Sequence, residues 1–319
     1  MKLPALTFAA VFIEIALCVT AITKFELWLV AALLAAYHAG YFLSGGRTPK
    51  LWVVLGLLSL AGGLVSGAPA WLALGAFGMN SGIQGARTAL KQAGPSGTGA
   101  KYAAKFGAMA AVSLTALMGL LDFSLAAVSA AAALLVFLTK EHAKDAAWYW
   151  CSGQEGLLWA ELLHHAHYFL YCYILWAKFE SGVYPYIGLL FALGWLGYGL
   201  METISKRAGA AHGLAILAGG HVLCALTILA MAFTDSGPLL ALLWGLTGLW
   251  GGSCYYLGRF SFTSQRETYE NLGHFVGCAL SAYICHVSGA KAAIITAAAV
   301  CLAVTLFAVS AMKGRSHHE

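Results

Sequence analysis

Long apolar stretches follow one another along almost the whole chain, and this pattern limits what the chain can fold into. A helical stretch of about 17 to 25 residues with few charges matches the hydrocarbon core of a bilayer. The loops between these stretches are too short to hold a soluble domain. The sequence therefore predicts an all-α polytopic membrane protein with about twelve transmembrane helices. The predicted ranges are 4–23, 27–45, 50–66, 69–87, 102–121, 122–139, 154–177, 184–203, 210–233, 237–258, 270–287 and 291–312.

Composition supports a membrane protein. Hydrophobic residues make up 61% of the chain and charged residues only 10%, with a mean hydropathy of +0.78. A soluble domain carries about 25% charged residues. The first apolar stretch follows Lys2, as in a signal peptide, but it is long and holds Glu14 near its centre. We therefore expect an uncleaved first helix.

The distribution of Lys and Arg predicts the topology. If the chain starts inside and crosses twelve times, all of its 18 Lys and Arg fall on the cytoplasmic side except Lys24, Lys178 and Lys291. Such a bias is the positive-inside pattern of multi-pass proteins of the inner or plasma membrane, and it places both termini in the cytoplasm. The net charge of +5 is then a consequence of topology, and no nucleic-acid partner is expected.

The stretch 154–178 is apolar enough to span a membrane, yet it contains Glu155, Glu161, His164, His165 and His167. Ionisable side chains at membrane depth are costly and usually functional. At about 100° per residue, most of these groups share one arc of roughly 160° on a helix. Such a polar arc cannot be exposed to lipid, so we expect the arc to face the protein interior or a water-filled cavity.

The two halves of the chain resemble each other. A Lys-Phe-Glu triplet closes the first predicted helix at 24–26 and the seventh at 178–180. Pro69 and Gly78 of the fourth helix correspond in position to Pro238 and Gly248 of the tenth. Paired similarities in the same order indicate a duplication of six helices. We predict an N-terminal half at 1–139, a short cytoplasmic linker at 140–153 and a C-terminal half with a polar tail at 154–319.

With its basic, Gly-containing turn GYFLSGGRTPK at 40–50 and a degenerate copy at 197–207, the chain resembles the major facilitator superfamily. The acidic residue usual in that turn is absent, with Ser44 near its place. The resemblance implies two six-helix halves that rock around a midplane site lined by helices 1, 4, 7 and 10. It also implies that Glu14 faces helix 7 across the pseudo-twofold axis.

Those four predicted helices are also the ones that carry most of the polar side chains. On the fourth, Asn80, Gln84 and Arg87 are spaced by four and three residues and share one helical face. Aromatic residues of the seventh and tenth could stack on a planar or cationic solute. The predicted solute-binding residues are Asn80, Gln84, Arg87, His167, Tyr168, Tyr171, Trp250 and Tyr255.

Three interpretations of the histidine-rich stretch are open. Glu161, His164 and His165 lie one turn apart and could bind a transition metal. Alternatively, these three residues and Glu14 could take up and release a proton. This interpretation requires fewer side chains to converge on one point than a metal site does. In the third interpretation the histidines only hydrogen-bond to neighbouring helices.

Other histidines and cysteines are expected to be structural. His38, His221 and His286 each stand alone in an apolar stretch, which is typical of packed or interfacial groups. The cysteines form no C-x-x-C pair, and nearly all fall inside predicted helices as small apolar residues.

The sequence as a whole favours a secondary active transporter of a small polar solute, working by alternating access with proton coupling. A metal ion or metal chelate is the leading specific solute because of the histidines. No enzymatic activity and no required cofactor are expected, and the partners are the lipid bilayer, the solute and protons. The alternatives are an intramembrane metal-dependent enzyme and a non-transporting membrane assembly or sensor protein.

Overall fold

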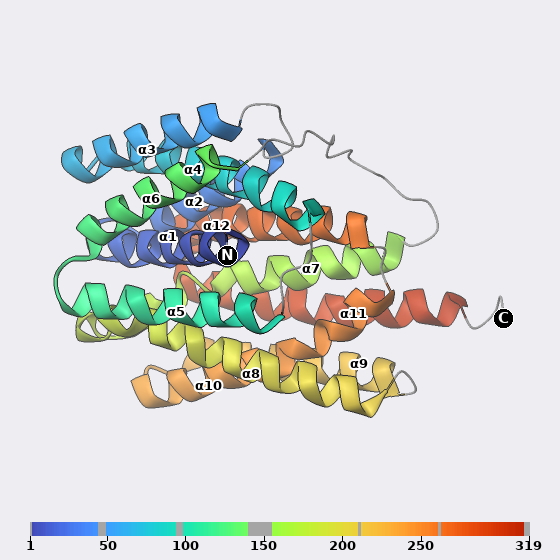
Figure 1. Ribbon diagram of the computed structural model, residues 1–319. Coiled ribbons are helices and arrows are strands. Elements are labelled where there is room, and N and C mark those ends of the chain that lie inside the picture. Colours follow the sequence, from blue (N-terminus) through green and yellow to red (C-terminus); the bar gives the residue numbers. More distant parts are fainter. Residues whose placement is uncertain are drawn as a thin grey trace. The chain divides into compact units, whose positions relative to one another are not determined.

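The computed structural model describes residues 2–43, 49–93, 98–139, 155–209, 212–260 and 263–315. Within these residues the chain is almost entirely helical and contains no strand (Figure 1). The α-helices are α1 (Lys2–Lys24), α2 (Leu27–Ala39), α3 (Pro49–Ser66), α4 (Pro69–Ala93), α5 (Thr98–Leu117), α6 (Leu121–Phe137), α7 (Glu155–Tyr171), α8 (Ile187–Ala208), α9 (Gly213–Phe233), α10 (Gly237–Gly251), α11 (Tyr255–Phe260) and α12 (Thr263–Arg315).

Short 3-10 turns interrupt several predicted helices. They are η1 (Gly40–Leu43) after α2, η2 (Leu175–Lys178) and η3 (Ser181–Tyr186) after α7, and η5 (Gly252–Cys254) between α10 and α11. Conversely, α12 runs through two predicted segments. Gly289 divides α12 with φ of 80° and ψ of 170°, a conformation that glycine adopts without steric cost.

Several helices are long and apolar enough to cross a membrane. By length and composition these are Lys2–Lys24, Ser181–Ala208, Ala215–Phe233 and Arg266–Ser310. Shorter apolar helices cover Leu27–Phe42, Lys50–Ser66 and Leu121–Phe137. The chain is therefore a multi-pass membrane protein.

The chain divides into two compact units. The first unit comprises Met1–Ala147 with Ser181–Leu189, and the second comprises Trp148–Glu180 with Leu190–Glu319.

In the first unit α1 is the central helix. It contacts α2, α4, α5 and α6, and Leu6, Ile13 and Leu17 along it are fully buried. The helices α3 and α4 approach closely because Gly56 and Gly78 face each other, and a Cβ at Gly78 would lie 2.7 Å from the Gly56 Cα. Small residues at this crossing thus fix the position of α4, which carries Asn80, Gln84 and Arg87.

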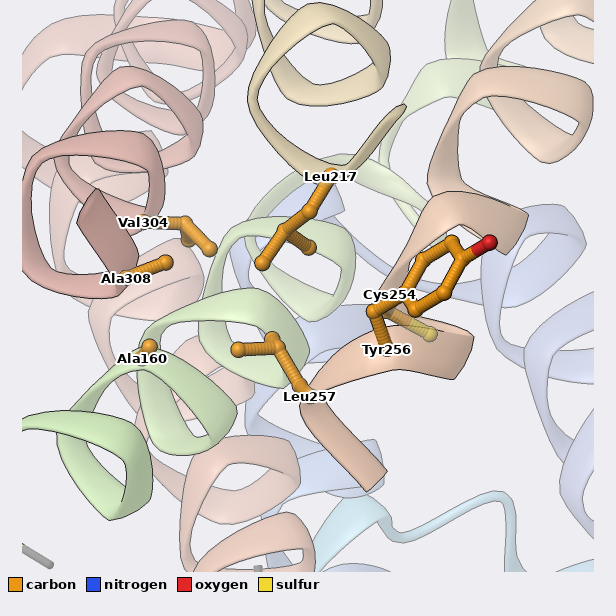
Figure 2. Packing of buried hydrophobic residues seen from close by; sticks show 7 residues of the cluster. All are labelled: Ala160, Leu217, Cys254, Tyr256, Leu257, Val304 and Ala308. Carbon is orange, nitrogen blue, oxygen red and sulfur yellow. The ribbon is translucent and has the colours of Figure 1, made fainter. Parts of the chain in front are cut away.

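In the second unit α7 is surrounded by other helices. It packs along α12 and also contacts α11, while α9 packs against α12 and α10. One apolar cluster joins these elements (Figure 2): it contains Ala160, Leu217, Cys254, Tyr256, Leu257, Val304 and Ala308. The cluster anchors α7 beside α9, α11 and the second part of α12, so the polar residues of α7 face protein.

Candidate functional site

The polar residues of α7 are buried and face two different neighbours. Glu161 is 0% exposed, His164 6% and His167 2%. Glu161 and His165 interact with α12, whereas His164 and His167 interact with α9. The polar arc of α7 faces protein within the second unit, as expected. Its residues contact two different helices, α12 and α9.

Glu161 and His165 belong to a cluster of charged residues between α7 and α12. The Arg266 Nε lies 2.8 Å from the Oε1 atoms of both Glu161 and Glu270. The His165 Nε2 lies 3.4 Å from Glu161 Oε1 and 3.8 Å from Glu270 Oε1. We call Glu161, His165, Arg266 and Glu270 the α7–α12 charge cluster. On its other side, His165 Nδ1 lies 3.0 Å from His274 Nε2.

The charge cluster has one more acidic group than fixed basic groups. Two carboxylates face one guanidinium, so the cluster carries one net negative charge when His165 is neutral and none when His165 is protonated. Charges removed from water are tolerated only when they are compensated. The Oε2 atom of Glu161 is buried and has no hydrogen-bond partner among the described residues. This arrangement can therefore hold a proton.

On the other side of α7, a hydrogen-bonded chain of histidines runs toward α9. His164 Nδ1 lies 3.0 Å from His221 Nε2. His221 Nδ1 lies 2.9 Å from the Leu217 carbonyl and 3.2 Å from Ser253 Oγ. The network assigns the protons: His221 Nδ1–H donates to Leu217, so its Nε2 accepts from His164 Nδ1–H.

His167 faces two thiols. Its Nε2 lies 4.0 Å from Cys224 Sγ on α9, and its Nδ1 lies 3.3 Å from the Leu163 carbonyl. Cys301 on α12 is buried nearby. The potential ligand atoms of His167, Cys224 and Cys301 lie within 4.8 Å of one another.

The metal ligands expected from the sequence do not come together as one group. Among the described residues, two sets of possible ligand atoms lie within 4.8 Å: Glu161, His165 and Glu270, and the thiol–histidine set above. His164 belongs to neither. Two adjacent residues on a helix point about 100° apart, which explains why His164 and His165 face different helices.

In the first unit, polar groups connect α1, α2 and α4. Asn80 Nδ2 donates to the Tyr37 carbonyl at 2.7 Å, Gln84 Nε2 donates to Asn80 Oδ1 at 3.2 Å, and Arg87 Nη1 donates to Gln84 Oε1 at 2.9 Å. These three side chains share one face, as their spacing predicts. Glu14 Oε1 lies 4.0 Å from Nε2 of the buried His38.

The predicted aromatic residues lie at different places in the second unit. Tyr168 and Tyr171 both pack against Trp244 of α10. Their ring centroids lie 5.8 and 5.9 Å, respectively, from the ring centroid of Trp244. The ring of Tyr255 lies 5.6 Å from Lys206 Nζ at the end of α8. Trp250 is half-buried in α10. The expected solute-binding aromatics are therefore not one group.

Sequence reasoning missed several partners. Arg266, Glu270 and His274 are spaced by four residues and lie on one face of α12, a pattern that was visible in the sequence. Arg266 was counted only as a cytoplasmic charge because the predicted apolar span began at 270. His221 was expected to be a packed histidine, and no local pattern marks it as the partner of His164.

Comparisons with known proteins identify the fold. No family model and no curated protein matches the chain. Among solved structures, the nucleoside transporter NupG has a TM-score of 0.61 at 14% identity and covers 98% of this chain and 100% of its own. A bacterial homolog of the human lysosomal transporter Spinster has 0.61 at 12%, covering 98% and 96%. The human organic anion transporter MFSD10 (TETRAN) has 0.55 at 12%, covering 96% and 99%.

These structures are transporters of the major facilitator type, and the similarity extends over nearly the whole of each chain. Their sequence identity to this chain is low, so the similarity concerns the course of the backbone. The expectation from the Gly-containing turn at 40–50 is confirmed at this level: the chain has the major facilitator fold.

Proposed function

We propose that this protein is a secondary active transporter of a small polar solute that works by alternating access. The observation that carries the proposal is the major facilitator fold over 98% of the chain. In this proposal 1–139 and 154–319 are the two halves, 140–153 links them, and both termini are cytoplasmic. The positive-inside bias supports this orientation.

Twelve crossings are part of the proposal. Each predicted range contains helical residues, and Gly289 provides a break at which α12 can leave the membrane and return. The elements α10, η5 and α11 together would make one broken crossing. Broken helices at membrane depth are typical of transporter sites, because an interrupted helix exposes backbone groups to a protein interior.

We propose that the α7–α12 charge cluster couples transport to protons. One proton taken up by the cluster brings it to neutrality, and loss of that proton leaves an uncompensated carboxylate. Outside the cluster, Tyr198 of α8 and Cys254 of η5 lie near Glu161, His274 contacts His165, and His164 lies beside His165. None of these four described neighbours supplies a fixed positive charge, so we propose that protonation balances the carboxylate that Arg266 leaves uncompensated.

The proposed solute carries an anionic or polar group. Arg87, with Gln84 and Asn80 behind it, offers a positive charge held in place by side-chain hydrogen bonds. Structures with this fold include organic anion and nucleoside transporters. The remaining residues expected to contact the solute are His167, Tyr168, Tyr171, Trp250 and Tyr255, and Glu14 and His164 are the other expected proton carriers.

A metal ion or metal chelate is the second candidate solute. The ligand atoms of Glu161, His165 and Glu270 lie within 4.8 Å, which favours it. However, the Arg266 guanidinium already contacts both carboxylates, so a cation would have to displace it. For this reason we place a proton, and not a metal, in this cluster.

Reconstitution into liposomes tests the proposal. Nucleosides, organic anions and metal chelates are offered to liposomes with an imposed pH gradient, and uptake is compared for the native protein, Glu161→Gln and the control Glu202→Gln. Native protein and control should accumulate one class of solute against its concentration gradient. Glu161→Gln should lose this accumulation while still exchanging labelled solute at equal concentrations.

Other outcomes separate the alternatives. Accumulation by Glu161→Gln equal to that of the native protein would remove the proton-coupling proposal. A solute that is chemically converted without a gradient would indicate the intramembrane enzyme. If no solute in the three classes crosses the membrane, the result would favour an assembly or sensor protein.

A further inference from the structure

A buried group of sulfur and nitrogen atoms lies in the second unit, away from the α7–α12 charge cluster. It consists of His167 on α7, Cys224 on α9 and Cys301 on α12, which we call the thiol–histidine set. All three side chains are buried: His167 is 2% exposed, Cys224 1% and Cys301 0%. Three separate helices thus bring one soft ligand each to one point inside a single unit.

We propose that the thiol–histidine set is a resident site for a thiophilic metal ion of the zinc kind, which ties α7, α9 and α12 together. This inference does not depend on the proposed transport function, and it removes His167 from the residues that are expected to contact the solute. The set supplies three buried protein ligands, so the fourth position of a tetrahedral ion would be filled by a water molecule or another small ligand.

The distances suit such an ion after a small contraction. Zinc binds sulfur at about 2.3 Å and imidazole nitrogen at about 2.0–2.1 Å, so tetrahedral ligand atoms lie roughly 3.5–3.8 Å apart. The His167 Nε2 and Cys224 Sγ atoms are 4.0 Å apart, and no pair in the set exceeds 4.8 Å. Side-chain rotations that move the ligand atoms together by roughly 0.3 to 1 Å would bring their separations to those of a zinc site.

His167 is oriented as a metal-binding histidine is. Its Nδ1–H donates to the Leu163 carbonyl at 3.3 Å, so the Nε2 lone pair points toward the thiols. A carbonyl on the second ring nitrogen is the usual support of a metal-bound imidazole.

Charge favours a divalent ion. Without metal, the Cys224 thiol donates to the Thr247 carbonyl at 3.7 Å and the Cys301 thiol donates to the His221 carbonyl at 3.4 Å. Binding of a divalent ion replaces both thiol protons: M²⁺ joins two thiolates and one neutral imidazole, and two H⁺ leave. The product has no net charge, which a low-dielectric interior tolerates best, whereas Cu⁺ with two thiolates would leave one negative charge.

Metal content of the purified protein is the test. The chain is produced without an affinity tag and without residues 316–319, because His317 and His318 could bind metal themselves. Cells receive Zn²⁺, Co²⁺ or Cu⁺ in separate cultures. The variants are Cys224→Ser with Cys301→Ser, His167→Gln, and the matched control Cys278→Ser, a buried cysteine of α12 outside the set.

We expect one zinc or cobalt ion per native or Cys278→Ser chain. The cobalt form should show thiolate-to-metal charge-transfer absorption in the near ultraviolet, and the double cysteine variant should lose both the ion and the band. Equal metal content in the native protein and the double variant would overturn the proposal, as would a cobalt form without thiolate bands. Copper retained in preference to zinc would overturn the assignment to a divalent ion.

Two readouts guard against a variant that fails to fold. Size-exclusion chromatography and helical circular dichroism identify such a variant. If the double variant aggregates, each single cysteine variant should lose the ion and the charge-transfer band, because only two ligands would remain and the buried site would carry a net positive charge. A disulfide between Cys224 and Cys301, found by mass spectrometry of the native chain, would also contradict the metal site.

Discussion

Replacement of Arg266 by glutamine should destabilise the protein strongly. The Arg266 Nε lies 2.8 Å from a carboxylate oxygen of Glu161 and of Glu270. Without the guanidinium, two carboxylates remain beside each other, and the Glu161 side chain is 0% exposed. Water therefore cannot replace the lost partner of Glu161.

The free-energy cost of Arg266→Gln follows from the burial of its partners. Removal of one partner of a buried ion pair costs about 3–5 kcal/mol. The Arg266 side chain is 28% exposed, so we take the lower limit of about 3 kcal/mol. The double variant Arg266→Gln with Glu161→Gln should be more stable than Arg266→Gln alone, with a coupling of about 1–2 kcal/mol, because it removes the uncompensated carboxylate.

The assay is reversible unfolding in mixed micelles with increasing SDS. The control is the pair Lys24–Asp122 in the first unit, whose Nζ and Oδ2 atoms are 2.6 Å apart but whose side chains are 38% and 48% exposed. Lys24→Gln should cost only about 0–1 kcal/mol. A cost near that of Lys24→Gln, or a double variant less stable than Arg266→Gln, would refute the reasoning.

Three further perturbations test the packing and the polar networks. Gly248→Ala should lower the thermal midpoint, because its Cβ would collide with the Gly194 carbonyl and overpacking costs about 1–3 kcal/mol, whereas Gly251→Ala meets open space and should be neutral or stabilising. His221→Leu leaves the buried His164 Nδ1–H without its acceptor and should cost about 1–3 kcal/mol in SDS unfolding, with recovery when His164→Leu is added. Asn80→Ala removes the hydrogen bond to the Tyr37 carbonyl and should cost about 1 kcal/mol in the same assay; no change would show that this bond is replaced by water.

The fold was accessible from the sequence because membrane helices are specified by length and apolar content. Each predicted range overlaps an observed helix, although some ranges are interrupted and two are merged in α12. Pro69 begins α4 as its fixed φ favours, after a turn in which Gly67 has a φ of 69°. The interruptions were not predicted. A helix end at Tyr171, or a 3-10 turn at Gly252–Cys254, depends on contacts with other helices and leaves no mark on hydropathy.

The candidate site was predictable only in part. Hydropathy and helical periodicity identified the polar residues of α7. The four-residue spacing of Arg266, Glu270 and His274 is also visible in the sequence, but it was missed because the predicted apolar span began at 270. Neither signal states which helices pack together, so the partners of Glu161 and His165 remained unknown. The thiol–histidine set could not be predicted from the sequence, because Cys224 and Cys301 each stand alone in apolar helices that are far apart in the chain.

The distance between the two units as a function of pH tests the central claim, a proton-driven change between two conformations. Spin labels at Ser66→Cys and Asp235→Cys, one in each unit, are placed at exposed positions that the topology assigns to the outer side. Native cysteines that react with the label are replaced, and pulsed electron paramagnetic resonance is recorded in lipid nanodiscs. The transporter proposal predicts two distance populations whose ratio changes with pH in the native background and does not change with Glu161→Gln. A single distance at every pH in both backgrounds would contradict it.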